Sequence, residues 1–219
     1  MNPRPLLLGH RGARAVRSIP ENTFASFDRA LADGCDGFEF DVRLTADGQA
    51  VICHDPKVGA LEVAQATAEQ LAGLPRLDDV LERYEGTAFL DIELKVPGLE
   101  RIAIDSLKAH TPRRGFVVSS FLPEVLHALH EEDSSVPLGL ICETKSQRLQ
   151  WRKLPLEYVV PHYKLVSEEL IRELRQARKK ILVWTVNDPQ DMQRFAKWGV
   201  EGIISDDTQL LAASTAKSM

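Results

Sequence analysis

The sequence predicts an α/β fold in which eight parallel strands close into a (β/α)₈, or TIM, barrel. Short apolar segments typical of buried strands recur along the chain, and each leads to a segment with helical periodicity. With one antiparallel hairpin left aside, these strand segments number eight, and eight successive β–α units indicate a closed barrel. A doubly wound open sheet is the alternative. The expected strands cover residues 6–9, 37–42, 88–95, 116–120, 137–142, 157–161, 181–185 and 201–205.

A helix is expected after each strand. Asn22 or Thr23 can cap the first helix, which continues to about Asp33, because Gly34 is a typical helix stop. The polar tail after about Ala213 is expected to be frayed. The other helices are expected near residues 77–84, 99–110, 123–130, 145–152, 167–179, 189–198 and 207–213, of which the one at 145–152 is poorly patterned.

A β-hairpin extension and a short cap insertion are expected after the second strand. Residues 43–54 contain a turn too short for a crossover helix, so the strand that follows it should run antiparallel to the second strand. This hairpin would fold back over the second strand and return His54 to the same end of the sheet. Residues 56–76 form the cap insertion, in which 67–71 is expected to be a short capped helix.

The composition is that of an ordinary globular chain. It has 219 residues, is 44% apolar and 27% charged, and has a net charge of −5, which argues against nucleic acid as the main partner. Three scattered cysteines, Cys35, Cys53 and Cys142, are expected to be buried free thiols in a reducing compartment. We therefore expect one domain over residues 1–219 and a cytoplasmic location. No stable membrane insertion is expected, because Met1 to Leu8 is too short for a signal peptide or a span. The oligomeric state stays open.

Acidic side chains alternate with apolar ones on the second and third expected strands. Glu39 and Asp41 stand at i and i+2 and so share one face of a strand, and Glu93 lies on the neighbouring strand. Clustered carboxylates repel one another and are costly to desolvate, and the usual remedy is a bound cation. An all-oxygen ligand set without a Cys/His cluster favours one divalent cation, Mg²⁺ or Ca²⁺. For the Glu39–Asp41 pair alone, the polar outer face of a half-exposed strand is the alternative interpretation.

Cationic and imidazole side chains are expected at the same end of the barrel, where the carboxyl ends of the strands lie. His10 and Arg11 end the first strand, Lys95 ends the third, and His54 ends the hairpin. Arg11 and Lys95 would hold a phosphate together with the metal, leaving His10 and His54 free as acid and base. This combination indicates phosphoryl-ester cleavage. Lys95 could instead form only a surface ion pair, and each histidine could be a hydrogen-bonded loop residue.

Other residues near this end have mainly structural interpretations. Asp91 lies one step deeper on the face of Glu93, and Trp184 is a core residue unless it lies at the barrel mouth. The fifth strand offers only Glu143 and the sixth only His162.

The motifs resemble those of the glycerophosphodiester phosphodiesterases, a (β/α)₈ family of the wider phospholipase-C-like phosphodiesterase group. Each motif is weak alone, but they occur in the family's order over nearly the whole chain, which makes the set highly specific. The matching stretches are His10-Arg11-Gly12, Pro20-Glu21-Asn22-Thr23, Glu39-Phe40-Asp41-Val42, Asp47-Gly48, His54-Asp55, Glu93-Leu94-Lys95, Ser119-Ser120-Phe121, Trp184-Thr185-Val186-Asn187 and Gly202-Ile203-Ile204-Ser205-Asp206.

The resemblance implies hydrolysis of a small-molecule glycerophosphodiester to sn-glycerol 3-phosphate and an alcohol. A glycerol hydroxyl would attack phosphorus first, and water would then open a cyclic intermediate. The resemblance implies that His10 and His54 are the general base and acid pair. It also implies one Mg²⁺ or Ca²⁺ ion and assigns the remaining roles as follows: metal ligands Glu39, Asp41 and Glu93, phosphate contacts Arg11 and Lys95, and a glycerol pocket lined by Trp184.

The sequence departs from the family pattern after His54-Asp55. The family's Leu-Asp-Arg-Thr run is absent, the chain reads Pro56-Lys57-Val58-Gly59 there, and the insertion is shorter than usual. A smaller cap suggests an open site that accepts several head groups. Two other functions are kept as alternatives: a lysophospholipase D that acts on lysophospholipids, and a non-catalytic barrel that binds phosphorylated ligands. A Schiff-base aldolase is disfavoured because Lys95 stands beside Glu93, and nearby anions raise a lysine pKa.

Overall fold

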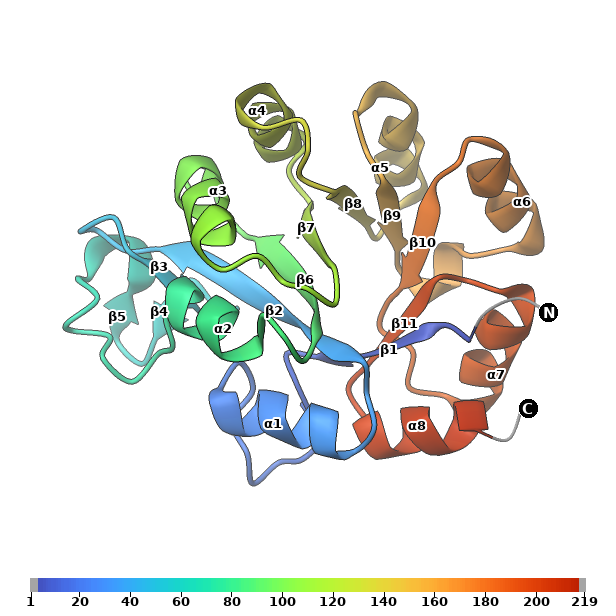
Figure 1. Cartoon of the computed structure of the whole chain (residues 1–219), viewed down its shortest axis with the longest axis horizontal. Coiled ribbons are helices and arrows are strands. Elements are labelled where there is room, and N and C mark those ends of the chain that lie inside the picture. Colours follow the sequence, from blue (N-terminus) through green and yellow to red (C-terminus); the bar gives the residue numbers. More distant parts are fainter. Residues whose placement is uncertain (1–3, 217–219) are drawn as a thin grey trace.

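The structure, a computed structural model, describes residues 4–216, and its eight parallel strands close into a barrel surrounded by helices (Figure 1). The order around the sheet is β1-β11-β10-β9-β8-β7-β6-β2, and pairing of β1 with β2 closes it. The predicted (β/α)₈ barrel is therefore confirmed. The barrel strands are β1 (Leu6–His10), β2 (Gly37–Leu44), β6 (Phe89–Leu94), β7 (Phe116–Ser120), β8 (Leu138–Cys142), β9 (Tyr158–Pro161), β10 (Lys180–Val183) and β11 (Gly202–Ser205).

The helices pack on the outside of the barrel and differ from their predicted bounds by a few residues. Thr23 caps α1, as predicted, since its side chain accepts a hydrogen bond from the Ser26 N–H. The weakly patterned segment near 145–152 forms a short helix and then a 3₁₀ turn. The α-helices are α1 (Phe24–Ala32), α2 (Leu77–Tyr84), α3 (Glu100–Ala109), α4 (Pro123–Glu132), α5 (Lys145–Leu149), α6 (Glu168–Gln176), α7 (Pro189–Trp198) and α8 (Thr208–Ala216).

Apolar side chains fill two spaces, one between the strands and the helices and one inside the barrel. In the outer layer Phe27 of α1 stacks on Phe38 of β2, with ring centroids 4.2 Å apart. The inner cluster consists of Leu8, Phe89, Val117, Ile141, Tyr158, Val160, Leu182 and Ile204. Since these apolar side chains fill the barrel interior, the polar residues at the carboxyl ends of the strands pack against a solid apolar core.

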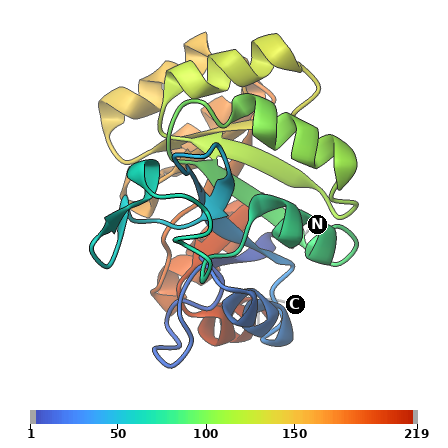
Figure 2. The same ribbon diagram turned by 90° about the vertical axis from the view of Figure 1, so that its left-hand side faces the viewer.

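The hairpin extension is confirmed, since β3 (Ala50–Ile52) pairs antiparallel with the end of β2. The insertion that follows is a second hairpin of β4 (Lys57–Val58) and β5 (Leu61–Glu62) with the 3₁₀ turn η1 (Val63–Gln65), and it lies to one side of the barrel (Figure 2). Val63, Ala66 and Leu71 of the insertion pack with Val51 and Cys53 of the hairpin extension in a small separate core.

Two predictions about local structure are wrong. Residues 67–71 form turns rather than a helix, since the Leu71 N–H is shared between the Thr67 and Ala68 carbonyls and the helical hydrogen-bond pattern does not continue. The chain does not fray after Ala213, because α8 continues to Ala216 with Ser214 and Thr215 buried. The rest of the predicted tail, 217–219, lies outside the described residues.

Among residues 4–216, no helix combines the length and apolar character needed to cross a membrane.

Candidate active site

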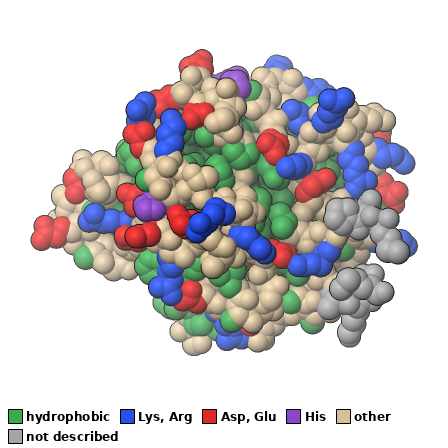
Figure 3. Space-filling model, in the orientation of Figure 1, with side chains coloured by type: hydrophobic (Ala, Val, Ile, Leu, Met, Phe, Trp, Pro, Cys, Tyr) green, Lys and Arg blue, Asp and Glu red, His purple; other side chains and the backbone are tan. Residues whose placement is uncertain are grey.

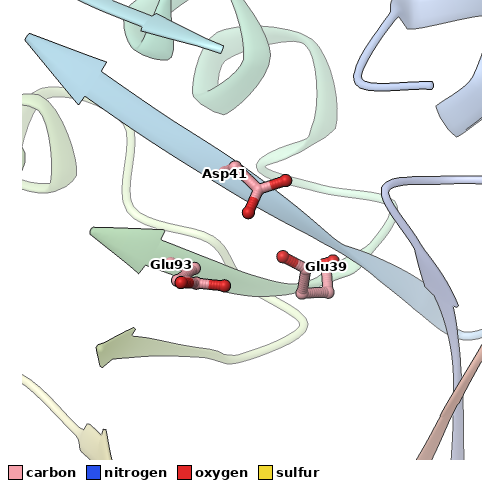
Figure 4. Close-up of side chains that lie close together, drawn as sticks. All are labelled: Glu39, Asp41 and Glu93. Atoms are coloured by element: carbon pink, nitrogen blue, oxygen red, sulfur yellow. The ribbon is translucent and has the colours of Figure 1, made fainter. Parts of the chain in front are cut away.

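Three carboxylates lie on two adjacent barrel strands and face a common space (Figure 4). Asp41 of β2 stands beside Glu93 of β6 in the parallel register, and Glu39 lies two residues before Asp41 on the same face. One oxygen from each carboxylate lies within 4.8 Å of the others. All three side chains are buried, with 1% to 7% of their surface exposed. The alternation of the two strands thus brings together the acids that the sequence predicted.

Burial and mutual repulsion disfavour the negative charge on two of these acids, Glu39 and Glu93. Burial, together with the charges of Asp41 and Glu93, raises the pKa of Glu39 well above its usual value. Burial and Asp41 likewise raise the pKa of Glu93 to about 7. Glu39 Oε1 is buried and has no hydrogen-bond partner among the described residues. Three buried carboxylates, one with a free oxygen, fit the ligand preference of a hard divalent cation.

Arg11 and Lys95 lie against these carboxylates. Lys95 Nζ is 2.6 Å from Glu93 Oε1 and 3.2 Å from Asp41 Oδ1. Arg11 Nε is 3.3 Å from Asp41 Oδ2, and the Arg11 backbone N–H donates to Glu39 Oε2 at 3.0 Å. Burial disfavours the charge on Asp41, but Lys95 and Arg11 outweigh it and lower its pKa. One carboxylate of the cluster is therefore ionised before any cation binds.

Arg11 and Asn22, which lie beside the carboxylates, both have a strained, left-handed backbone conformation. Both residues have positive φ angles, 52° and 57°, in the left-handed region that side chains other than glycine seldom adopt. The Asn22 N–H donates to the Arg11 carbonyl at 3.0 Å, and Asn22 Nδ2 donates to Asp41 Oδ2 at 2.8 Å. Glu21, beside Asn22, accepts a hydrogen bond from the Arg11 guanidinium at 2.8 Å. The loop before α1 thereby orients both the Arg11 guanidinium and the Asp41 carboxylate.

His10 is held by a carboxylate on the strand beside it. Its Nδ1 lies 2.7 Å from Asp206 Oδ1, at the end of β11. Burial opposes ionisation of Asp206, but the hydrogen bond and charge of His10, together with hydrogen bonds from Asn187 and Arg14, outweigh burial and lower its pKa well below the usual range. An ionised carboxylate can only accept, so His10 Nδ1 donates and Nε2 is left to face Glu39 at 3.8 Å. Asn187 Nδ2 donates to the other oxygen of Asp206 at 2.7 Å.

His54 lies across the site in a more exposed position. Its Nδ1 is 2.7 Å from Asp55 Oδ1, and its backbone carbonyl accepts a hydrogen bond from Arg43 Nε at 2.8 Å. Burial is the main cause that lowers its pKa. The hairpin therefore delivers a second imidazole, neutral near pH 7, to the carboxyl end of the barrel, as the sequence predicted.

One pocket of about 270 Å³ joins these groups. Of the residues predicted for the site, it is lined by His10, Arg11, Glu39, His54, Glu93, Lys95 and Trp184, while Asp41 stands behind them against Lys95 and Arg11. Asp91, Phe121, Ile141, Glu143, Val160 and Ile204 complete the lining. On the face seen in Figure 3, charged side chains of both signs and a histidine gather near an apolar area close to the middle. Every residue predicted for the site lies in or against this pocket.

Comparison with known proteins decides the family. Residues 10–210 match the model of the glycerophosphoryl diester phosphodiesterase family, a span that contains all of the residues above. The chain belongs to this family. The resemblance predicted from the sequence motifs, and with it the prediction of an enzyme of this class, is confirmed.

Relatives of this phosphodiesterase family share nearly the whole chain. A glycerophosphodiester phosphodiesterase of Caldanaerobacter subterraneus is 30% identical over 95% of this chain and 96% of its own. A second, from Bacillus subtilis, is 28% identical over 93% of this chain and 84% of its own. A solved phosphodiesterase of Oleispira antarctica, in complex with the product sn-glycerol-3-phosphate, has a TM-score of 0.85 at 23% identity, with 97% of both chains covered.

Several contacts in this family member could not be predicted from its sequence. Asp206 and Asn187 occur in the matching motifs, but the contact of Asp206 with His10 follows from closure of the barrel between β1 and β11, and Asn187 donates to Asp206. Glu21 and Asn22 occur in one of the matching motifs, but their contacts with Arg11 and Asp41 were not predicted. Ser119 Oγ donates to Asp91 Oδ1 at 2.6 Å, and Ser120 Oγ donates to the Leu94 carbonyl at 2.8 Å.

Proposed function

We propose that the chain hydrolyses small-molecule glycerophosphodiesters to sn-glycerol 3-phosphate and an alcohol. The observation that carries the proposal is the meeting of three clustered carboxylates, two cations and two imidazoles at one pocket. The names of the relatives support the substrate class, and the product named for the Oleispira antarctica protein agrees with it.

We propose that Glu39, Asp41 and Glu93 hold one divalent cation, Mg²⁺ or Ca²⁺. The fit rests on the free oxygen of Glu39 and on the raised pKa of Glu39 and Glu93, which a bound cation would reverse. The cation would offset negative charge on the phosphoryl oxygens.

Arg11 and Lys95 would contact the phosphate. The pKa of each is raised because neighbouring carboxylates outweigh the effect of burial, so both stay cationic in the working pH range. Arg11 offers a planar fork and Lys95 a point charge with several donors.

His10 and His54 would divide the two proton transfers. One imidazole accepts the proton of the attacking hydroxyl, and the other donates a proton to the oxygen of the leaving alcohol. Each ring is anchored through Nδ1 to an aspartate, which leaves Nε2 of each to exchange the proton. Trp184 would line the side of the pocket that receives glycerol.

We also propose that the whole chain is one catalytic domain with a short cap insertion, and that it acts in the cytoplasm. The three cysteines are buried free thiols, which fits a reducing compartment.

The test is release of sn-glycerol 3-phosphate from sn-glycero-3-phosphocholine with Mg²⁺, with Ca²⁺ and with a chelator. We expect metal-dependent release that Glu39→Ala abolishes and that Glu131→Ala, a change at an exposed acid of α4, leaves intact. A folded wild type that releases nothing with either metal would refute the proposal. Activity on lysophospholipids in the same assay would support the lysophospholipase D alternative, and binding of phosphodiesters without turnover would support the non-catalytic barrel.

A further inference from the structure

The pocket has two unlike sides. The side formed by β1, β2, β6 and the hairpin carries the carboxylates, the two cations and both histidines. The opposite side is lined by apolar side chains from β8 to β11 and from the residue after β7: Phe121, Ile141, Val160, Trp184 and Ile204. A glycerophosphodiester whose phosphate lies at the charged side would place one of its two ester groups against the apolar side.

The apolar side offers few hydrogen bonds to a polyol. Trp184 Nε1 already donates to the Val160 carbonyl at 2.9 Å, which fixes the indole and uses its only donor. Phe121 packs edge-on against Trp184, with ring centroids 5.5 Å apart. A glycerol hydroxyl that leaves water for this wall loses its partners, and an unmatched polar group is costly to bury.

Glu143 is the one polar side chain that lines this side of the pocket among the described residues. It directly follows β8 and is exposed, and no hydrogen bond or ion pair of its carboxylate is present among residues 4–216. Its backbone is fixed, because Gln147 Oε1 accepts from the N–H groups of Glu143 and Thr144 at 3.1 and 3.0 Å, in a capping box of α5. A free acceptor thus stands on a fixed backbone beside the apolar wall.

We propose that Glu143 accepts a hydrogen bond from the glycerol hydroxyl farthest from the phosphate. This makes Glu143 a specificity-determining residue that favours glycerol esters over esters of alcohols without that hydroxyl. The inference rests on the proposed function and deepens it, because it names the group of the substrate that the apolar side receives. A carboxylate suits this role since, when ionised, it is an acceptor with room for more than one hydroxyl.

Two substrates test the inference. One is sn-glycero-3-phosphocholine, and the other is the phosphocholine ester of propane-1,2-diol, which keeps the hydroxyl next to the ester carbon and lacks the outer one. We expect the wild type to prefer the glycerol ester in kcat/KM by about 10- to 100-fold, as sites built to pair a hydroxyl discriminate against its absence.

Variants of Glu143 distinguish recognition of the outer glycerol hydroxyl from a general effect on activity. Glu143→Ala should remove the preference by lowering kcat/KM for the glycerol ester alone. Glu143→Gln keeps an amide oxygen as acceptor and should retain most of the preference. Glu131→Ala is the matched control at an exposed acid and should leave both rates unchanged.

Three outcomes would overturn the inference while leaving the proposed function intact. They are a wild type that does not discriminate between the two esters, an unchanged preference in Glu143→Ala, and an equal loss on both esters. A fourth assay, with bis(glycero)phosphate in place of the choline ester, asks whether Glu143 instead faces a cationic head group. A Glu143→Ala defect confined to choline would also overturn the inference. A wild type that cleaves no glycerophosphodiester at all refutes the proposed function itself.

Discussion

His10 and Asp206 stand 196 positions apart in the chain, and their side chains meet at 2.7 Å across the β1–β11 contact. The bond holds one nitrogen of the imidazole and leaves the other toward the carboxylate cluster. The His10 imidazole at the end of the first strand is therefore held by the residue that follows the last strand.

Loss of this carboxylate should damage turnover more than binding. Asp206→Asn can hold the imidazole in the wrong tautomer, so we expect kcat to fall roughly 100-fold with little change in KM. Steady-state kinetics on a glycerophosphodiester checks this. Asp207→Asn, which alters the next acid in the chain, serves as the control. A change in KM alone would contradict the positioning role.

Metal-free protein should lose stability as pH rises. The pKa of Glu93 in the folded chain is about 7, against a usual value of 4.5, so the folded state binds the extra proton between these values. Stability is therefore highest below pH 4.5 with respect to this group, falls as pH rises to about 7, and stays low above it. Thermal unfolding in chelator across this range should show the fall, and Glu93→Gln should reduce it.

Divalent cations should reverse that loss. At pH 8 we expect Mg²⁺ or Ca²⁺ to raise the Tm of the wild type in a saturable way, because ligands that bind only the folded state stabilise it. Glu93→Gln should raise the Tm in chelator and weaken the response to cation. An equal response in both proteins would show that the cation binds elsewhere.

Lys95→Met should destabilise the metal-free fold. It removes a cation that lies within 3.2 Å of both Asp41 and Glu93 and leaves two buried acids less compensated. We expect a loss of about 3 kcal/mol in the free energy of unfolding, measured with urea. Lys145→Met, at an exposed lysine of α5, should change it by no more than about 0.5 kcal/mol.

Asn22 should be hard to replace. Asn22→Ala loses the hydrogen bond to Asp41. It also places alanine, whose side chain forms no hydrogen bond, at a strained φ of 57°. We expect a loss of about 2 kcal/mol in the free energy of unfolding. Asn22→Gly accepts the backbone angle, so comparing the two variants by urea unfolding separates strain from the lost bond. Equal stability of Asn22→Ala and wild type would contradict this account.

The barrel could be predicted because its parts repeat. Alternation predicted that Glu39 and Asp41 share one face of a strand and that Glu93 lies on the neighbouring strand. The register that sets Asp41 beside Glu93 comes from the structure. The partners of these residues could not be predicted in the same way. Asn22 reaches Asp41 only through a left-handed loop, and Asp206 reaches His10 only because the barrel closes.

The errors lie where local patterns are short or ambiguous. Thr67 and Gln70 resemble a helix cap, and the side chain of each accepts from the backbone N–H of the other, but only turns follow. Thr215 reads as tail because it is polar, yet its hydroxyl donates to the Leu211 carbonyl within α8, which satisfies it in a buried position.

The insertion after His54 packs with Val51 and Cys53 of the hairpin in a small separate core and adds no strand to the closed ring. The insertion can therefore change in length or sequence without disturbing the register of β2 and β6, which aligns the carboxylates. Among the described residues, none that lines the pocket belongs to this insertion, so changes confined to it leave the pocket lining itself unaltered. Exchange of this segment between related enzymes would therefore test its influence on the substrate without altering the carboxylates, cations and histidines of the pocket.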